Sequence, residues 1–212
     1  VKNFAFIGHI YPEVLQIVVL ESSGIQSIAD LQGKRVATGP GGSATSVVSE
    51  IILNAYGVTD YTAFSEGFGA AKDQVQDGNI DASIGILGLP AASIQELQAA
   101  TGEAKILEIT GPELDQIVEE SGYFEFVIPA GTYEWINEDI TTISAYAILV
   151  ANTDTVDDEL AYQLAKVMIE NAHENTHAQA VHMTKENALN GSEGLPIHPG
   201  AERYYKEIGL LP

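Results

Sequence analysis

The stretch ATGPGGSATS, residues 37–46, has the residue types needed to bind a small anion. Its glycines and hydroxyl residues are Gly39, Gly41, Gly42, Ser43 and Thr45. Glycine lets the backbone turn with its N–H groups exposed, hydroxyl groups add donors, and a following helix adds partial positive charge. These groups together suit a carboxylate. By residue types alone, however, a plain helix cap at a tight turn is the favoured interpretation.

Three known motifs resemble this turn, and none fits completely. A Walker A loop needs a Gly-Lys-Ser/Thr ending, whereas the chain has GSA at 42–44. The dinucleotide pattern G-x-G-x-x-A is matched at 39–44 with Asp60 beyond it, but Pro40 stiffens the loop and Asp60 falls in a turn. A nucleophile elbow, G-x-S-x-G, fails because Thr45 occupies the last glycine position.

The sequence HENTH at 173–177 matches the zinc-peptidase pattern H-E-x-x-H. On a helix, two histidines four residues apart can share a zinc ion while the glutamate acts as a base. A third ligand is missing, because Met183 stands where a histidine would be needed and Glu193 lies in a loop-like stretch. Asn175 and Thr176 are also poor residues for a helix interior. We interpret this segment as a polar helix end and predict no metal site.

No other residues identify a catalytic centre. The chain has no cysteine, which excludes disulfides, thiolate catalysis and cysteine-based zinc sites. His9, His182 and His198 are isolated, and no nucleophile is paired with a base. Acidic residues are so abundant that any pair of carboxylates could be coincidental, so the sequence does not identify a glycosidase-like pair of catalytic carboxylates.

The 212-residue chain is strongly acidic, with 30 Asp and Glu against 9 Lys and Arg and a formal net charge of −21. Such a surface repels nucleic acid and anionic membranes, so neither is an expected partner. An ordinary acidic protein and adaptation to high salt are both compatible with this charge. An apolar content of 45% and a mean hydropathy of +0.06 indicate a globular chain, and no apolar run is long enough to cross a bilayer.

Strand patterns alternate with helix patterns along the chain. Strands are predicted at 15–20, 34–39, 61–65, 80–87, 105–110, 122–133 and 143–151. Helices are predicted at 45–56, 70–78, 112–121, 157–172 and 198–209, with one more that starts at Pro90 and a short turn at 27–33. This alternation predicts an α/β sheet with parallel strand pairs.

Four phrases occur together in one family's order and spacing. They are IYPEVLQIVVLESSGIQSIADLQGKRVATGPGGSAT (10–45), DGNIDASIGILGLPAASIQEL (77–97), VIPAGTY (127–133) and GLPIHPGAERYYKEIG (194–209). On these phrases the chain resembles the TAXI-family solute receptors, the extracytoplasmic binding proteins of TRAP transporters, over nearly its whole length.

The resemblance implies a type II periplasmic-binding-protein-like α/β fold, with two lobes joined by crossover strands. Residues 16–148 would form the complete second α/β lobe. Residues 1–15 and 149–212 would form a partial first lobe, a crossover strand and the C-terminal helices. The N-terminal part of such a receptor, including its signal peptide, would be missing from this chain.

The resemblance also implies ligand-binding residues. The glycine turn would grip a carboxylate, a tyrosine would face it from the first lobe, and a second strand-to-helix turn would line the same cleft. The implied set is Tyr11, Gly41, Gly42, Ser43, Ala44, Thr45, Gly88, Leu89 and Pro90. A loop at 131–133 lies near this cleft in the family. Neither Arg35 nor Arg203 is placed to clamp a carboxylate, unlike the arginine of other TRAP receptors.

We therefore expect a non-catalytic solute-binding receptor in the periplasm or on the outer cell surface. It would capture a small organic anion, such as glutamate or another carboxylate, and deliver it to TRAP membrane permease subunits. No cofactor, metal, nucleic acid or membrane insertion is expected. The alternative is a nucleotide- or dinucleotide-dependent α/β enzyme that uses the turn at 39–44.

Overall fold

The computed structural model describes residues 3–212. The chain divides into two compact units: unit 1 comprises Val1–Glu13 and Ala145–Pro212, and unit 2 comprises Val14–Ser144. Strands β1 and β7 each contribute residues to both units. The predicted mixed α/β fold is confirmed.

The strands alternate with helices along unit 2. They are β1 (Phe4–Leu20), β2 (Arg35–Ala37), β3 (Thr62–Phe64), β4 (Ala82–Leu87), β5 (Ala104–Leu107), β6 (Phe124–Ile128) and β7 (Ile140–Asn152). The sheet order is β3-β2-β4-β1-β7-β6, and β5 also pairs with β1. β2 is parallel to both β3 and β4, whereas β1 is antiparallel to β4 and to β5.

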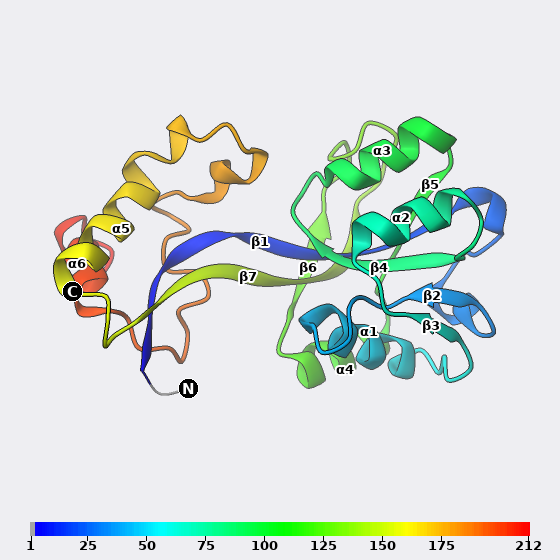
Figure 1. Cartoon of the computed structure of the whole chain (residues 1–212), viewed down its shortest axis with the longest axis horizontal. Coiled ribbons are helices and arrows are strands. Elements are labelled where there is room, and N and C mark those ends of the chain that lie inside the picture. The colour runs from blue at the N-terminus through cyan, green and yellow to red at the C-terminus, as the bar shows by residue number, and fades with distance from the viewer. Residues whose placement is uncertain (1–2) are drawn as a thin grey trace. The chain divides into compact units, whose positions relative to one another are not determined.

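Helices cover both faces of the sheet in unit 2. They are α1 (Ala44–Ala55), α2 (Phe68–Gln76), α3 (Ala92–Thr101) and α4 (Pro112–Ser121), and unit 1 holds α5 (Asp158–Glu170) and α6 (Pro199–Glu207). Short 3-10 helices are η1 (Glu21–Ser23), η2 (Ile28–Leu31), η3 (Ala172–Glu174) and η4 (Ala178–His182). α1 and α4 lie on one face of the sheet, and α2 and α3 lie on the other (Figure 1).

Local signals in the sequence set several helix boundaries. Ser43 caps α1, because its hydroxyl oxygen accepts the N–H of Ser46 at 3.1 Å, and Gly57 follows the helix with φ of 71°. α4 begins at Pro112, whose missing N–H costs nothing there, and ends before Gly122 at φ of 72°. These boundaries agree with the sequence predictions.

Other predicted boundaries are wrong. The strand predicted at 15–20 is only the end of β1, whose earlier part includes polar residues and so lacks a clear apolar pattern. Pro90 does not open a helix: it follows a cis peptide bond and precedes Ala91, the N-cap of α3. The extended stretch predicted at 122–133 ends at Ile128, and the helix predicted to reach residue 172 ends at Glu170.

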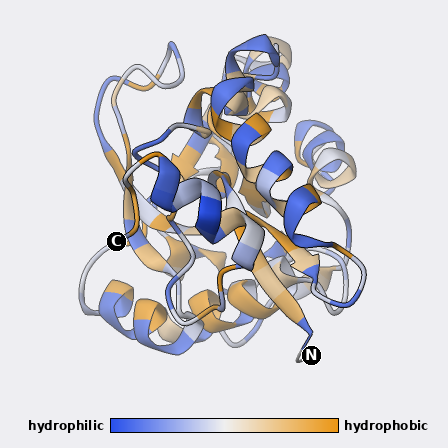
Figure 2. Ribbon diagram, turned by 90° about the vertical axis from the view of Figure 1, so that its left-hand side faces the viewer, coloured by the Kyte–Doolittle hydropathy of each residue, from blue (hydrophilic) through white to orange (hydrophobic). Residues whose placement is uncertain are grey.

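β1 is buried on both faces within unit 2, so its apolar residues alternate between two cores. Leu15, Ile17 and Val19 pack in one cluster with residues of α1 and α4. Val14 and Val18 pack in the other cluster with residues of α2 and α3. The strands are hydrophobic along most of their length, whereas the helices carry hydrophilic bands (Figure 2).

In unit 1, α5 and α6 pack closely at a glycine. A Cβ atom added to Gly200 would lie 2.0 Å from the carbonyl oxygen of Asp158. Tyr204 and Tyr205, on the same helix, are fully buried in the unit 1 core. The close approach of the two helices therefore requires residue 200 to have no side chain.

We predict that Gly200→Ala lowers the free energy of unfolding by about 2 kcal/mol, because the two helices must move apart to admit the methyl group. Urea denaturation measures this change. Gly69→Ala is the matched control: Gly69 is also helical, and its added Cβ would meet nothing within 4 Å. The control is expected to be neutral or stabilising. Equal effects of both variants would contradict the packing argument.

Candidate functional site

The candidate site lies at the carboxyl edge of three neighbouring strands in unit 2. β3, β2 and β4 are adjacent and parallel, so the turns after them lie at one edge of the sheet. These turns lead into α2, α1 and α3 respectively. The chain passes from β2 to β3 on one side and returns to β4 on the other side of β2. In open α/β sheets, ligands bind outside the carboxyl ends of strands at such a reversal.

The glycine turn after β2 has a conformation that requires glycine. Gly39 has φ of 86°, and a Cβ atom there would lie 2.7 Å from Cβ of Thr45. Gly42 also has a positive φ, of 77°, whereas a Cβ at Gly41 would meet nothing within 4 Å. The side chain of Thr45 therefore packs over Gly39 and fixes the turn at the start of α1.

Donors at this turn are unused within the protein. The N–H groups of Gly41, Gly42, Ala44 and Thr45 take part in no hydrogen bond among the described residues. The oxygen of the Ser43 hydroxyl is occupied by the helix cap, but its proton remains free to be donated. The cap and the anion-binding interpretations are thus compatible, because the cap uses the oxygen and leaves the other donors free.

The second turn, after β4, adds donors at the same edge. Gly88 and Leu89 are half-buried and Pro90 is exposed. No side chain caps α3, and the N–H groups of Ala92 and Ser93 have no partner in the described part of the chain. The glycine turn and the second turn, both predicted from the sequence, therefore follow adjacent parallel strands.

A buried chain of hydrogen bonds supports this second turn, and sequence reasoning missed Gln16, the residue at its end. The Ala91 N–H donates to the Tyr133 hydroxyl at 2.9 Å, which donates to Oε1 of Gln16 at 2.6 Å. Gln16 and Tyr133 are fully buried, and burial raises the pKa of Tyr133 to about 12. The amide nitrogen of Gln16 has no partner among the described residues. The signal in the sequence that could have identified Gln16 is its position as the one polar residue of the apolar run LQIVVL, residues 15–20.

Tyr11 belongs to unit 1. Its hydroxyl donates to a carboxylate oxygen of Glu13 at 3.3 Å, and its side chain is half-buried. Burial raises the pKa of Tyr11, and the negative charge of Glu13 adds to that effect. Its proposed role toward a ligand stays a prediction.

Both arginines are engaged elsewhere. Arg35 starts β2, at the edge opposite the glycine turn, and its guanidinium binds both carboxylate oxygens of Asp81 at 3.0 and 2.7 Å. These donors lower the pKa of Asp81. In unit 1, Arg203 pairs with Glu159 and lies 4.4 Å above the ring of Tyr162. The glycine turn therefore has no arginine from unit 2, as the sequence indicated.

The geometry argues against two of the alternative motifs. Asp60 precedes β3, so in the parallel sheet it lies at the edge opposite the glycine turn and is not positioned to bind a dinucleotide ribose there. His173 lies in η3, and His177 is the N-cap of η4, after an extended residue at Asn175. The two histidines are thus not on one helix, as the zinc-peptidase motif requires. Within residues 3–212, no cluster of three potential metal-binding side chains is found.

A profile described as the NMT1-like family matches residues 1–209. The chain belongs to the NMT1-like family. In the described part of this NMT1-like protein, no helix combines the length and apolar character needed to cross a membrane.

Solved structures similar to this NMT1-like chain include three binding proteins. One is an ABC transporter periplasmic binding protein from Brucella ovis with glutathione bound (13% identity, TM-score 0.46, 85% of this chain and 51% of that one). Another is an ancestral arginine-binding protein bound to arginine (17% identity, TM-score 0.45, 97% of this chain and 64% of that one). The third is an amino acid ABC transporter substrate-binding protein from Streptococcus pneumoniae bound to L-arginine (16% identity, TM-score 0.44, 88% of this chain and 61% of that one). This chain thus spans 51% to 64% of their lengths.

We predict that Tyr133→Phe lowers the free energy of unfolding by about 2 kcal/mol, because the Ala91 N–H and Oε1 of Gln16 lose their buried partner. Urea denaturation measures the change. Tyr61→Phe is the control, since Tyr61 is half-buried and its hydroxyl makes no hydrogen bond in the described part of the chain. If Tyr133→Phe lowers the free energy of unfolding no more than the control does, the hydrogen bonds of Tyr133 to Ala91 and Gln16 contribute nothing to stability.

Stability is also predicted to depend on His9. Burial, and then the charge of His182, lower the pKa of His9 from 6.5 to about 4. Between these values the unfolded chain binds a proton that the folded chain does not, so stability falls as pH drops from 6.5 toward 4, by at most about 1.4 kcal/mol per pH unit. Unfolding of wild type and His9→Gln at pH 7 and pH 5 tests this. A pH dependence equal in both proteins would refute the assignment to His9.

Proposed function

We propose that this NMT1-like chain is the ligand-gripping part of an extracytoplasmic solute receptor that carries a small organic anion to a membrane permease. The observation that supports this most is the set of unused N–H donors on the glycine turn, at the point where the strand order reverses. α1, α2 and α3 all begin at that edge, so their partial positive charges favour an anion there.

The donor set favours a carboxylate, such as that of an amino acid. Gly41, Gly42, Ala44 and Thr45 offer neutral N–H groups, and Ser43 offers a hydroxyl proton. Neutral donors satisfy a singly charged carboxylate without adding a fixed positive charge, whereas recognition of phosphate is commonly reinforced by Arg or Lys. In unit 2, Gly88, Leu89 and Pro90 are proposed to line the site around the remainder of the ligand. In unit 1, Tyr11 is proposed to be a ligand-binding residue.

The transporter class follows from the four sequence phrases, which resemble TAXI receptors and favour a TRAP permease as the partner. The solved structures similar to this chain are described instead as ABC-transporter proteins, with glutathione or arginine bound. Capture of a small carboxylate is proposed from the donors of the glycine turn, so this part of the proposal does not depend on the permease class.

We predict that L-glutamate binds the 212-residue chain and that Ser43→Ala with Thr45→Val weakens binding at least tenfold. The double variant removes two hydroxyl donors at the turn and leaves the backbone N–H groups in place. Isothermal titration measures the affinity. A parallel thermal-shift panel with dicarboxylates, NAD and ATP separates a receptor from a nucleotide-dependent enzyme, because only bound ligands stabilise the folded state.

Loss of the Ser43 cap is itself expected to cost about 1 kcal/mol of stability. Asp157→Ala is the matched control, because Asp157 caps α5 in unit 1 by accepting the Leu160 N–H at 2.8 Å. It removes a helix cap without touching the glycine turn and is expected to leave the affinity unchanged. Stabilisation by NAD or ATP but not by carboxylates, or equal affinities in the double variant and wild type, would overturn the proposal.

A further inference from the structure

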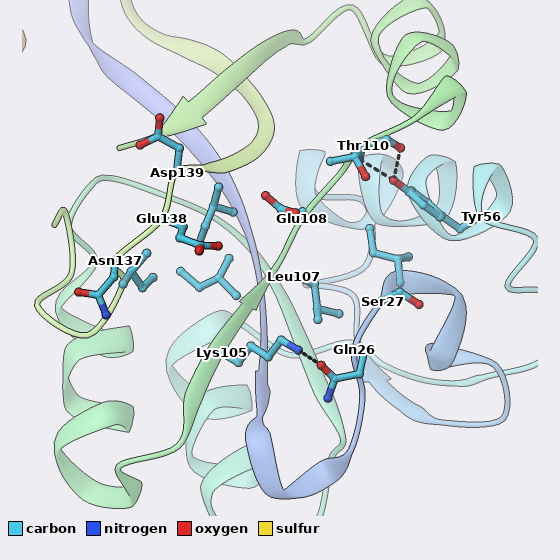
Figure 3. Close-up of a pocket in the computed structure, with 14 residues that line it drawn as sticks. Gln26, Ser27, Tyr56, Lys105, Leu107, Glu108, Thr110, Asn137, Glu138 and Asp139 are labelled. Carbon is cyan, nitrogen blue, oxygen red and sulfur yellow. Dashed lines mark hydrogen bonds between the residues drawn. The ribbon is translucent and has the colours of Figure 1, made fainter. Parts of the chain in front are cut away.

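A groove in unit 2 lies apart from the glycine turn. Its volume is about 700 Å³, and it is lined by segments 26–28, 105–108 and 136–140 together with Thr110 and with Tyr56 at the end of α1. We call it the β5 groove. Figure 3 shows β5 crossing it, with Gln26 and Ser27 on one side and Asn137, Glu138 and Asp139 on the other. Neither of the two turns of the candidate site contributes to it.

β5 presents an unpaired strand edge here. Among the described strands, β5 pairs with β1 alone. The Glu21 N–H donates to the Glu103 carbonyl, and the register pairs Val19 with Lys105. In an antiparallel ladder alternate residues point their peptide groups to opposite sides, so the N–H and C=O of Ile106 point away from β1.

The peptide groups of Ile106 have no internal partner. No hydrogen bond in the described part of the chain uses them, although Ile106 is only 5% exposed and lines the groove. Its side chain packs in the core with residues of α3. Peptide groups this deep in a protein are nearly always paired, and an added strand pairs them without any change of fold.

The three carboxylates that line the groove, those of Glu108, Glu138 and Asp139, form no ion pair among the described residues. Glu108 and Glu138 are exposed. Asp139 accepts a hydrogen bond from the Ala130 N–H at 2.8 Å, and Glu108 accepts one from the Thr141 N–H at 3.4 Å. The ammonium of Lys105 is turned toward Gln26 and does not neutralise them. The residues that line the groove thus include three acidic residues, Glu108, Glu138 and Asp139, and apolar residues such as Leu107.

We propose that the β5 groove binds an extended, basic peptide segment of a partner protein. The segment adds as a strand to the free edge of β5, exchanging hydrogen bonds with Ile106, and places a Lys or Arg side chain against Glu108 and Glu138. Main-chain pairing supplies affinity, and the carboxylates select the cationic side chain. The net charge of −21 also steers a basic partner toward the chain.

The probe is the acetylated, amidated peptide TVTRVTV, titrated into the 212-residue chain and followed by amide chemical shifts. We expect the largest shifts at Ile106 and Glu108. TVTEVTV is expected to bind at least tenfold more weakly because of charge repulsion. A TVTRVTV peptide N-methylated at alternate residues is expected to lose binding, because it cannot donate to the strand edge.

Glu108→Gln with Glu138→Gln is expected to reduce the affinity for TVTRVTV at least tenfold. The matched control is Glu119→Gln with Glu120→Gln, which removes the same charge from exposed positions on α4 outside the groove. If both double variants lose the same affinity for TVTRVTV, the effect comes from net charge alone and the proposal is overturned. Equal binding of spermidine, or retained binding of the N-methylated peptide, would assign the groove to small cations and overturn it as well.

Discussion

The antiparallel pairing of β1 with β4 is the interaction on which the rest of unit 2 depends. Its register sets Gln16 opposite Gly85, where a Cβ atom would lie 2.4 Å from the ring of Phe68. A slip of one residue would turn the buried residues of β1 to the wrong cores. The same register places Gln16 under Tyr133, which holds the start of α3. The position of the second turn is thus set by a strand pairing in the middle of the sheet.

The parallel pairing of β2 with β3 and β4 has a different consequence. It gathers the starts of three helices at one edge, where N–H groups are left without partners inside the protein. At the opposite edge, Arg35 binds Asp81 and holds the beginning of β2 against that of β4. One edge is therefore fixed by a charged pair, while the other keeps neutral N–H donors without internal partners.

Much of the fold was predictable from the sequence, because its signals are local. The cap at Ser43, the glycine after α1 and the proline at the start of α4 each act through residues within one turn. The length of β1 was not predictable, because His9 and Tyr11 interrupt the apolar pattern and their burial depends on distant residues. The helix start predicted at Pro90 was wrong for a different reason. A proline at a helix start and a proline in the turn before an N-cap have the same local sequence pattern.

The sequence by itself determined the alternation of strands and helices, the conformation of the glycine turn and the acidic character of the chain. The resemblance already implied that the two turns of the candidate site lie together, and the strand order shows the edge that they share. Only the tertiary structure decided that Gln16 is buried beneath Tyr133 and that β5 is left with a free edge. The physical reason is the range of the interactions. Caps and periodicity join neighbours in the chain, whereas strand register joins residues as far apart as Gln16 and Tyr133, which no local pattern encodes.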